Sequence, residues 1–303
     1  MSFQSFKRVY FLVPPMKSCN LCGSSNIQNY AQFNKYSLQK CSSCDLLFTD
    51  QDSIDMKSLY TKDYFDGIHG NFFADCKKDY ETRINTSKKL QNFQHVLKKI
   101  KETKSSGKFM DIGCATGVFL DMAQKEGYDV TGVDVSEFAC KYATENFGIK
   151  TLNGKLEDLQ LEEKSFDIIT MWDVIEHVPN PHAFLKEVHR ILKDDGIIFI
   201  LTVNDSSLMG WGAEAAYLGT FKLVPTFTRM IHPIHHNYHF KEKNLQQYLE
   251  KNGFSIDWKE KSEMPVENIE GNGLVKAMAH TLYFFSNATN LQHEMRIIAK
   301  KNE

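Results

Sequence analysis

Residues 111–117, DIGCATG, follow a short apolar run and precede a segment whose apolar residues have helical spacing. A strand, a glycine turn and a helix N-terminus in this order form an anion site, because free backbone N–H groups and the helix dipole face one point. Gly113 and Gly117 enclose three residues with Ala115 in the middle, unlike the G-x-G-x-x-G loop of dinucleotide sites. Asp134 lies 21 residues after Gly113, where a carboxylate can accept both ribose hydroxyls of a bound nucleoside.

From residue 108 onward, apolar runs of strand length alternate with helical patterns. The expected strands are 109–112, 129–133, 149–152, 166–171, 196–203, 254–261 and 294–299, and the expected helices are 117–126, 136–146, 181–192 and 243–252. Such alternation is typical of a doubly wound α/β domain. We therefore expect a Rossmann-like, seven-stranded, mostly parallel sheet with helices on both faces, completed by a hairpin whose arms carry an insertion between them.

Four of the seven cysteines form two C-x-x-C pairs near the N-terminus. Cys19 and Cys22 are separated from Cys41 and Cys44 by 18 residues. Two such turns present four thiolates to one tetrahedral ion, which is the usual structural zinc site. Because four thiolates leave no open coordination position, we expect this zinc ribbon to be structural rather than catalytic.

Composition limits the classes of function. The 303 residues are 42% hydrophobic and carry a net charge of −2, so no overall basic field favours nucleic acid as a partner. No run approaches the ~20 apolar residues that span a bilayer, and the apolar run 9–13 is too short for a signal sequence. We expect a cytoplasmic protein.

Further motifs follow the glycine loop in a fixed order. They are VTGVDVS (130–136), KSFDIIT (164–170) and WDVIEHVP (172–179). Together with DIGCATG, they resemble the successive motifs of class I S-adenosylmethionine-dependent methyltransferases. The resemblance implies that the loop holds the methionine end of this cofactor, that Asp134 holds the ribose, and that Leu156 and Glu157 meet the adenine.

The cofactor-binding residues that we expect are Asp111, Gly113, Cys114, Ala115, Gly117, Asp134, Val135, Leu156, Glu157 and Trp172, with Arg83 toward the cofactor carboxylate. Many relatives carry Gly-Asp-Ala where this chain has Gly154-Lys-Leu, so the adenine contact departs from the family pattern. A zinc ribbon followed by Tyr60-x-x-x-Tyr64 and a methyltransferase also resembles the zinc-ribbon methyltransferases of bacterial surface-polysaccharide and lipid pathways.

Asp173, Glu176 and His177 follow the fourth expected strand, where the methyl acceptor should lie. Residues at i, i+3 and i+4 share one face of a helical turn, so these side chains are expected to converge. Three interpretations stay open: they cap and pack the loop, His177 is a general base for a hydroxyl, or the three form a divalent-metal site with His236. The pattern resembles the metal-binding E-x-x-E-H of ubiquinone-pathway O-methyltransferases and small-RNA 2′-O-methyltransferases, with Asp173 in place of the first Glu.

These features give a plan of the chain. We expect an extension over 1–16, the zinc ribbon over 17–50, a helical linker or cap over 51–105, and a methyltransferase domain over 106–303 with an insert at 205–235. The apolar insert lacks clear periodicity and is expected to pack in the core or a homodimer, or to cover an apolar or lipid-linked acceptor at a membrane surface.

The expected activity is methyl transfer to a hydroxyl of a small, saccharide-linked or lipid-linked acceptor. Catalysis of such a transfer is mainly in-line positioning and removal of the acceptor proton. Two alternatives are an RNA methyltransferase that uses the ribbon as a clamp, and a non-catalytic adaptor that binds S-adenosylmethionine. Only Lys17, Lys35 and Lys40 supply positive charge to the ribbon, which disfavours RNA.

Overall fold

A computed structural model describes most of the chain. The described residues are 17–33, 36–50, 88–219, 228, 231–266 and 273–302. The expected extension and most of the expected linker, including Tyr60, Tyr64 and Arg83, lie outside the described residues. The predictions for those positions stay predictions.

Seven strands form one sheet in the order β10-β11-β8-β7-β4-β5-β6. Their bounds are β4 (Lys108–Ile112), β5 (Asp129–Asp134), β6 (Lys150–Asn153), β7 (Phe166–Trp172), β8 (Leu192–Val203), β10 (Phe254–Ser262) and β11 (Glu294–Lys301). β4 to β8 pair in parallel, whereas β10 and β11 run antiparallel to their neighbours. The predicted Rossmann-like, mostly parallel sheet with its closing hairpin is confirmed.

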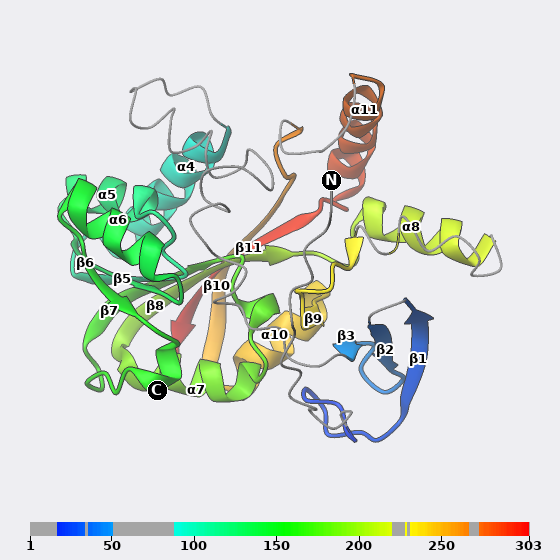
Figure 1. The fold of residues 1–303 in the computed structure, drawn as a ribbon, viewed down its shortest axis with the longest axis horizontal. Coiled ribbons are helices and arrows are strands. Elements are labelled where there is room, and N and C mark those ends of the chain that lie inside the picture. The colour runs from blue at the N-terminus through cyan, green and yellow to red at the C-terminus, as the bar shows by residue number, and fades with distance from the viewer. Residues whose placement is uncertain are drawn as a thin grey trace, which may run out of the picture.

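Helices cover both faces of this sheet (Figure 1). α4 (Lys88–Thr103), α5 (Val118–Lys125) and α6 (Glu137–Phe147) lie on one face, and α7 (Pro181–Ile191) and α10 (Glu242–Lys251) lie on the other. Side chains of a strand alternate between the two faces: Phe109 packs in the α4–α5 core, whereas Met110 packs in the α7–α10 core. The expected cap of α6 is also found, because the Ser136 hydroxyl accepts the Ala139 N–H.

The cysteine-bearing segment forms a second, antiparallel sheet. It consists of β1 (Ile27–Gln32), β2 (Ser37–Cys41) and β3 (Leu47–Asp50), and a two-residue strand, β9 (Tyr238–His239), completes it. In Figure 1 this sheet lies beside α10 and away from α4 to α6. Phe48 of β3, with Leu21 and Leu46 of the connecting segments, packs in the same core as Phe240 and Tyr248. The ribbon is therefore joined to the large domain by backbone pairing and by packing.

The insert contains a helix that was not predicted. α8 (Leu208–Gly219) is apolar at most positions, so its sequence shows no helical period of apolar and polar residues. α8 packs against α11 (Gly273–Thr289), which follows β10 and precedes β11 in the sequence. Exposed apolar side chains on these helices are Trp211, Leu218, Leu282, Phe284 and Phe285. Among the described helices, none combines the length and apolar character that crossing a membrane requires.

Candidate functional site

A cavity of about 570 Å³ opens where β4, β5, β6 and β7 end. One end of it is lined by the glycine loop, and the other end is lined by the segment after β7 together with Ile231, Pro233, His235 and His236. Ligands of open parallel sheets bind at the carboxyl ends of the strands. The cavity is therefore in the position where this fold places a cofactor and a second reactant side by side.

The glycine loop turns sharply between β4 and α5. Gly113 has a φ of 75°, and a Cβ atom there would lie 2.6 Å from Val174 Cγ2. Gly117 has a φ of 83°, and a Cβ atom there would lie 2.7 Å from the Ala143 Cβ. Both positions therefore require glycine for conformation and for space. Gly117 is buried against Ala143 of α6 and lets the chain turn into α5, and its expected contact with the cofactor stays a prediction.

Asp134 holds the loop in place from the end of β5. Its carboxylate accepts the Ala115 N–H at 2.9 Å and the Ser136 N–H at 2.8 Å, one on each oxygen. Each oxygen has a second lone pair, and Asp134 lines the cavity. Burial raises the pKa of Asp134, and the two N–H donors oppose that shift. The side chain is thus positioned both to fix the loop and to accept hydroxyl groups.

Asp111 lies deeper, at the end of β4. Its Oδ1 accepts a hydrogen bond from the Thr170 hydroxyl at 2.5 Å. Burial raises the pKa of Asp111 to about 8. The bond from Thr170 opposes this rise, and the negative charge of the neighbouring Asp134 adds to it. Asp111 borders the cavity but is buried, and its side chain is bonded to Thr170 of β7.

Aromatic rings close the side of the cavity under α4. The Trp172 ring packs edge-on against Phe93 and Phe119, with centroids 4.7 and 5.0 Å away. Its Nε1 is buried and has no hydrogen-bond partner. Lys89 and Phe93 of α4 line the cavity and were not predicted as site residues. Their four-residue spacing on one helix face is the signal that could have identified them.

The turn after β7 brings polar groups together at the far end of the cavity. Glu176, His177 and His236 each present a ligand atom, and these atoms lie within 4.8 Å of one another. Glu176 Oε2 accepts a hydrogen bond from Thr202 Oγ1 at 2.9 Å, whereas Oε1 is buried without a partner. His236 Nδ1 is also buried without a partner. Buried polar atoms without a protein partner fit a site that binds a ligand.

His177 has a defined tautomer. Its Nδ1 lies 2.8 Å from the His235 carbonyl, which only accepts, so Nδ1 carries the proton and Nε2 keeps its lone pair. Burial lowers the pKa of His177 to about 4. The imidazole is therefore neutral near pH 7, the form in which histidine binds a metal or accepts a proton.

Asp173 is separate from that group. It has a φ of 53°, so the chain is left-handed there, and the helical turn η2 spans only Ile175–His177. Asp173 is therefore not one turn below Glu176 on a common helix face, as the spacing predicted, although it lines the same cavity. Burial and the nearby carboxylates of Glu176 and Glu294 raise its pKa well above the usual range. Glu294, the first residue of β11, and His293 just before it also line this cavity and were not predicted.

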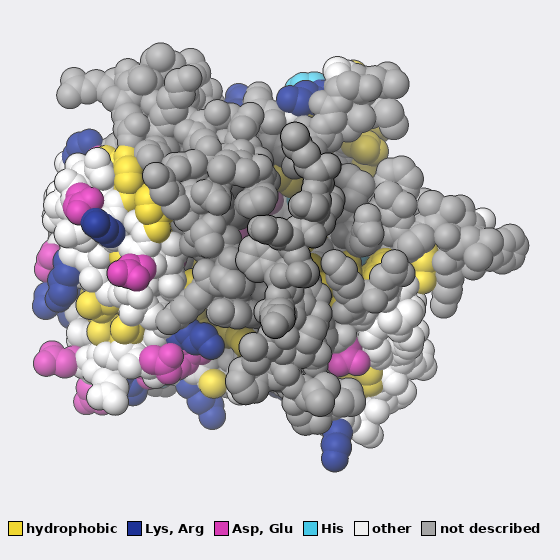
Figure 2. All heavy atoms as spheres, viewed as in Figure 1, with side chains coloured by type: hydrophobic (Ala, Val, Ile, Leu, Met, Phe, Trp, Pro, Cys, Tyr) yellow, Lys and Arg dark blue, Asp and Glu magenta, His cyan; other side chains and the backbone are white. Residues whose placement is uncertain are grey.

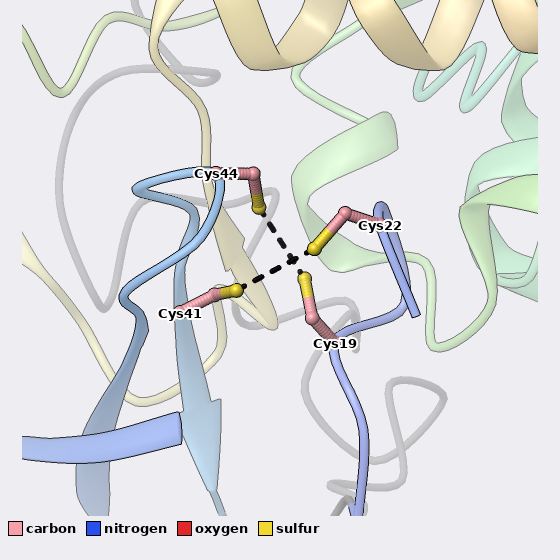
Figure 3. A group of neighbouring side chains, drawn as sticks. All are labelled: Cys19, Cys22, Cys41 and Cys44. Atoms are coloured by element: carbon pink, nitrogen blue, oxygen red, sulfur yellow. Dashed lines mark hydrogen bonds between the residues drawn. The ribbon is translucent and has the colours of Figure 1, made fainter. Parts of the chain in front are cut away.

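The four cysteines of the ribbon point at one centre (Figure 3). The Sγ atoms of Cys19 and Cys44 are 3.5 Å apart, and those of Cys22 and Cys41 are 3.6 Å apart. Bonds of ~2.3 Å to a tetrahedral zinc ion place two sulfurs roughly 3.8 Å apart, whereas a disulfide needs about 2.05 Å. The donor set fits one zinc ion, in the arrangement that the spacing predicted.

A model of the methyltransferase-domain family matches residues 82–257, more than half of the chain. The chain belongs to this family. The match covers the glycine loop, Asp134 and the Glu176–His177 turn, and it confirms the resemblance that the motifs indicated.

The methyltransferase has curated relatives named ubiquinone biosynthesis O-methyltransferase. One from Glaesserella parasuis serovar 5 is 32% identical over 140 residues, which cover 42% of this chain and 59% of that protein. One from Haemophilus ducreyi is 32% identical over 117 residues, or 34% of this chain and 50% of that protein. One from Coxiella burnetii is 29% identical over 203 residues, or 61% and 80%. The methyltransferase thus spans only about half of the length of the first two.

Among solved structures, the geranyl diphosphate C-methyltransferase of Streptomyces coelicolor A3(2) superposes with a TM-score of 0.51. It is 12% identical, and the likeness covers 70% of this chain and 81% of that one. At this identity the comparison supports the fold alone.

Most of the predicted site residues meet at one cavity. Those that line it are Asp111, Gly113, Cys114, Ala115, Asp134, Val135, Leu156, Glu157, Trp172, Asp173, Glu176, His177 and His236. Leu156 and Glu157 begin the short helix η1 (Leu156–Asp158), so the departure at Gly154-Lys-Leu does not remove them from the wall. Arg83 lies outside the described residues.

Proposed function

We propose that the protein transfers a methyl group from S-adenosylmethionine to a hydroxyl of a small, saccharide-linked or lipid-linked acceptor. One observation carries the proposal: a single cavity runs from the glycine loop to the Glu176–His177–His236 group. A cofactor at the loop and an acceptor at the histidines would therefore face each other in line. Effective transfer depends mainly on that alignment.

The residues at the loop fit this cofactor. Gly113 and Ala115 line the loop end of the cavity, where the methionine end would lie, and Asp134 offers lone pairs to ribose hydroxyls. Val135, Leu156 and Glu157 continue the wall toward the expected adenine position. The sulfonium of the bound cofactor supplies an electrophilic methyl group, so the protein's own task is to orient the acceptor and take its proton.

The far end of the cavity fits proton removal from a hydroxyl. His177, with a pKa near 4, is a weak base toward a hydroxyl on its own, which favours help from a divalent ion. The unpartnered Glu176 Oε1 and the neutral imidazoles of His177 and His236 suit such an ion, and Asp173 lines the same cavity. An ion there would hold two neighbouring hydroxyls of the acceptor and lower their pKa. The relatives named O-methyltransferases support a hydroxyl acceptor.

The outer surface gives further, weaker guidance about partners. The apolar side chains exposed on α8 and α11 suit an apolar group of the acceptor, a membrane surface or a second copy of the chain, and each stays a prediction. In Figure 2, basic and acidic side chains intermix over the described part of the view rather than gathering by sign. That mixture gives no support to the RNA alternative.

The proposal is tested by turnover with a panel of acceptors. The zinc-loaded protein is incubated with radiolabelled S-adenosylmethionine and with a catechol, a monophenol, a saccharide 1,2-diol or a bulk RNA, with and without added Mg²⁺. Label in a diol or catechol, increased by the metal, is the expected result. Label in RNA alone, with a steep salt dependence, or no label with any acceptor would overturn it.

A further inference from the structure

Strand β3 of the zinc ribbon contacts the segment that carries His236. The Thr49 hydroxyl donates to the His236 carbonyl at 2.6 Å, and the Thr49 N–H donates to the Asn237 carbonyl at 2.9 Å. Two residues earlier in the ribbon, β3 pairs with β9 through Leu47 and His239. The His236 segment is thus bonded to the ribbon at successive residues.

The same hydroxyl binds a second histidine. Thr49 Oγ1 lies 3.1 Å from His239 Nε2. Because its one hydrogen is donated to the His236 carbonyl, Oγ1 accepts from the Nε2–H of His239. Thr49 is buried, so neither bond competes with open solvent.

The opposite side of this segment is bonded to the turn after β7. The Asn237 N–H donates to the Glu176 carbonyl at 2.7 Å, and the Asn237 side-chain amide donates to the His177 carbonyl at 2.6 Å. Residues 235–239 therefore lie between the ribbon and the Glu176–His177 turn, and hydrogen bonds hold them from both sides.

The His236 ring has little to hold it by itself. Its Nδ1 is buried without a partner, and its described ring neighbours are the other histidines His177, His235 and His239. With no described hydrogen bond from its side chain, the ring is positioned by its backbone and by packing against these rings. At His236 that backbone is bonded to Thr49.

The zinc site fixes the start of β3. Cys41 ends β2, Cys44 follows in the turn, and β3 begins three residues later. The turn is closed by the Cys41 N–H to the Leu46 carbonyl, and Asn244 of α10 donates to the Cys44 carbonyl. A metal ion held by the four thiolates, together with α10, would therefore fix the start of β3 and with it the position of Thr49.

We propose that Thr49 is a positioning residue that fixes His236 at the acceptor end of the cavity, so that the zinc ribbon is a structural part of the active site. The inference extends the proposed function, because His236 is there expected to bind a metal or the acceptor. It assigns the ribbon a role in catalysis without any contact between its zinc and the reactants.

The test compares Thr49→Val, which keeps the shape and removes both hydroxyl bonds, with Thr49→Ser, which keeps them. Thr144→Val is the matched control, because it removes a hydroxyl bond to the Ile149 carbonyl at 2.9 Å on the distant helix α6. Long-range ¹H–¹⁵N spectra of the zinc-loaded, histidine-labelled proteins report the imidazoles, and His236→Gln identifies the His236 signals. The spectra need neither cofactor nor acceptor, so their result is independent of whether methyl transfer occurs.

We expect Thr49→Val to shift or broaden the His236 and His239 signals and to leave that of His95 on α4 in place. Thr49→Ser and Thr144→Val should match the wild type, and the dissociation constant of S-adenosylmethionine should change less than twofold in all three. If Thr49→Val does not fold, Thr49→Ala takes its place. Unchanged His236 signals in the folded variant, or the same shifts in Thr144→Val, would overturn the proposal.

Discussion

Glu176 and Thr202 are bonded at 2.9 Å, and that bond uses only one of the two carboxylate oxygens. The other oxygen is buried and unpartnered, and one oxygen of this carboxylate lies within 4.8 Å of ring nitrogens of His177 and His236. A buried carboxylate that is half satisfied is costly unless a ligand completes it. This relationship is the strongest structural reason to expect a second metal ion in addition to the ribbon zinc.

Glu176→Gln should weaken the binding of that second ion. The amide has the same shape but lacks the charge, and because changes to residues that only support a ligand already lower metal affinity by roughly 10–100-fold, a change in the ligand itself should lower it by at least about 10-fold. Calorimetric titration of the zinc-loaded protein with Mn²⁺ measures the change, with Glu145→Gln on the exposed side of α6 as the matched control. Equal Mn²⁺ affinity in Glu176→Gln and in the wild type would exclude this carboxylate as a ligand.

Cys19→Ser should release the ribbon zinc. Three thiolates bind the ion less tightly than four, and folding of such small modules depends on the metal. The measurement is zinc content per chain after gel filtration, expected to fall from about one to well below one. Cys140→Ser, which changes a buried cysteine of α6, should keep its zinc. Equal zinc in Cys19→Ser and the wild type would contradict the four-cysteine site.

Gly117→Ala should destabilise the fold strongly. The new Cβ would meet the Ala143 Cβ at 2.7 Å and Ile149 Cδ1 at 3.2 Å, in addition to the cost of a left-handed φ. Gly148 has a φ of 67° with nothing within 4 Å, so Gly148→Ala isolates the conformational cost of about 1 kcal/mol. Urea unfolding should show that Gly117→Ala loses at least about 1 kcal/mol more than Gly148→Ala. Equal losses of unfolding free energy in the two variants would mean that α6 shifts to accommodate the new methyl group at no cost.

The raised pKa of Asp111 should make the free energy of unfolding fall as the pH rises. Its pKa is about 8 in the folded protein, against about 3.9 in an unfolded chain. Between these values the folded state binds more protons, so the free energy of unfolding decreases with pH by at most about 1.4 kcal/mol per unit. Asp111→Asn keeps an oxygen for Thr170 and should flatten the curve from pH 4 to 8. Unfolding curves of the same slope in both proteins would show that Asp111 is charged throughout.

The order of elements followed from the sequence because strand and helix patterns are local. DIGCATG, the Ser136 cap and the C-x-x-C spacing each set the backbone within a few residues, and the structure has them where they were expected. α8 was missed because a mostly apolar helix shows no periodicity.

The missed parts of the site depend on contacts between distant segments. Thr49 and His236 are 187 residues apart, and β9 is only two residues long, so no local pattern marks their pairing. The left-handed backbone at Asp173 likewise separates a carboxylate that helical spacing had grouped with Glu176. Glu294 and His293 reach the cavity only because β11 lies beside β8.

The most direct test of the central claim is isothermal titration of S-adenosylmethionine into the wild type and into Asp134→Ala, with Asp129→Ala at the exposed start of β5 as the control. We expect one cofactor per chain in the wild type and in Asp129→Ala, and binding weakened at least about 10-fold in Asp134→Ala, since one charge-assisted hydrogen-bonding group is worth ~1.5–3 kcal/mol. No binding by the wild type at millimolar cofactor, or equal affinity in Asp134→Ala, would contradict the assignment of the Gly113–Gly117 loop as the cofactor site.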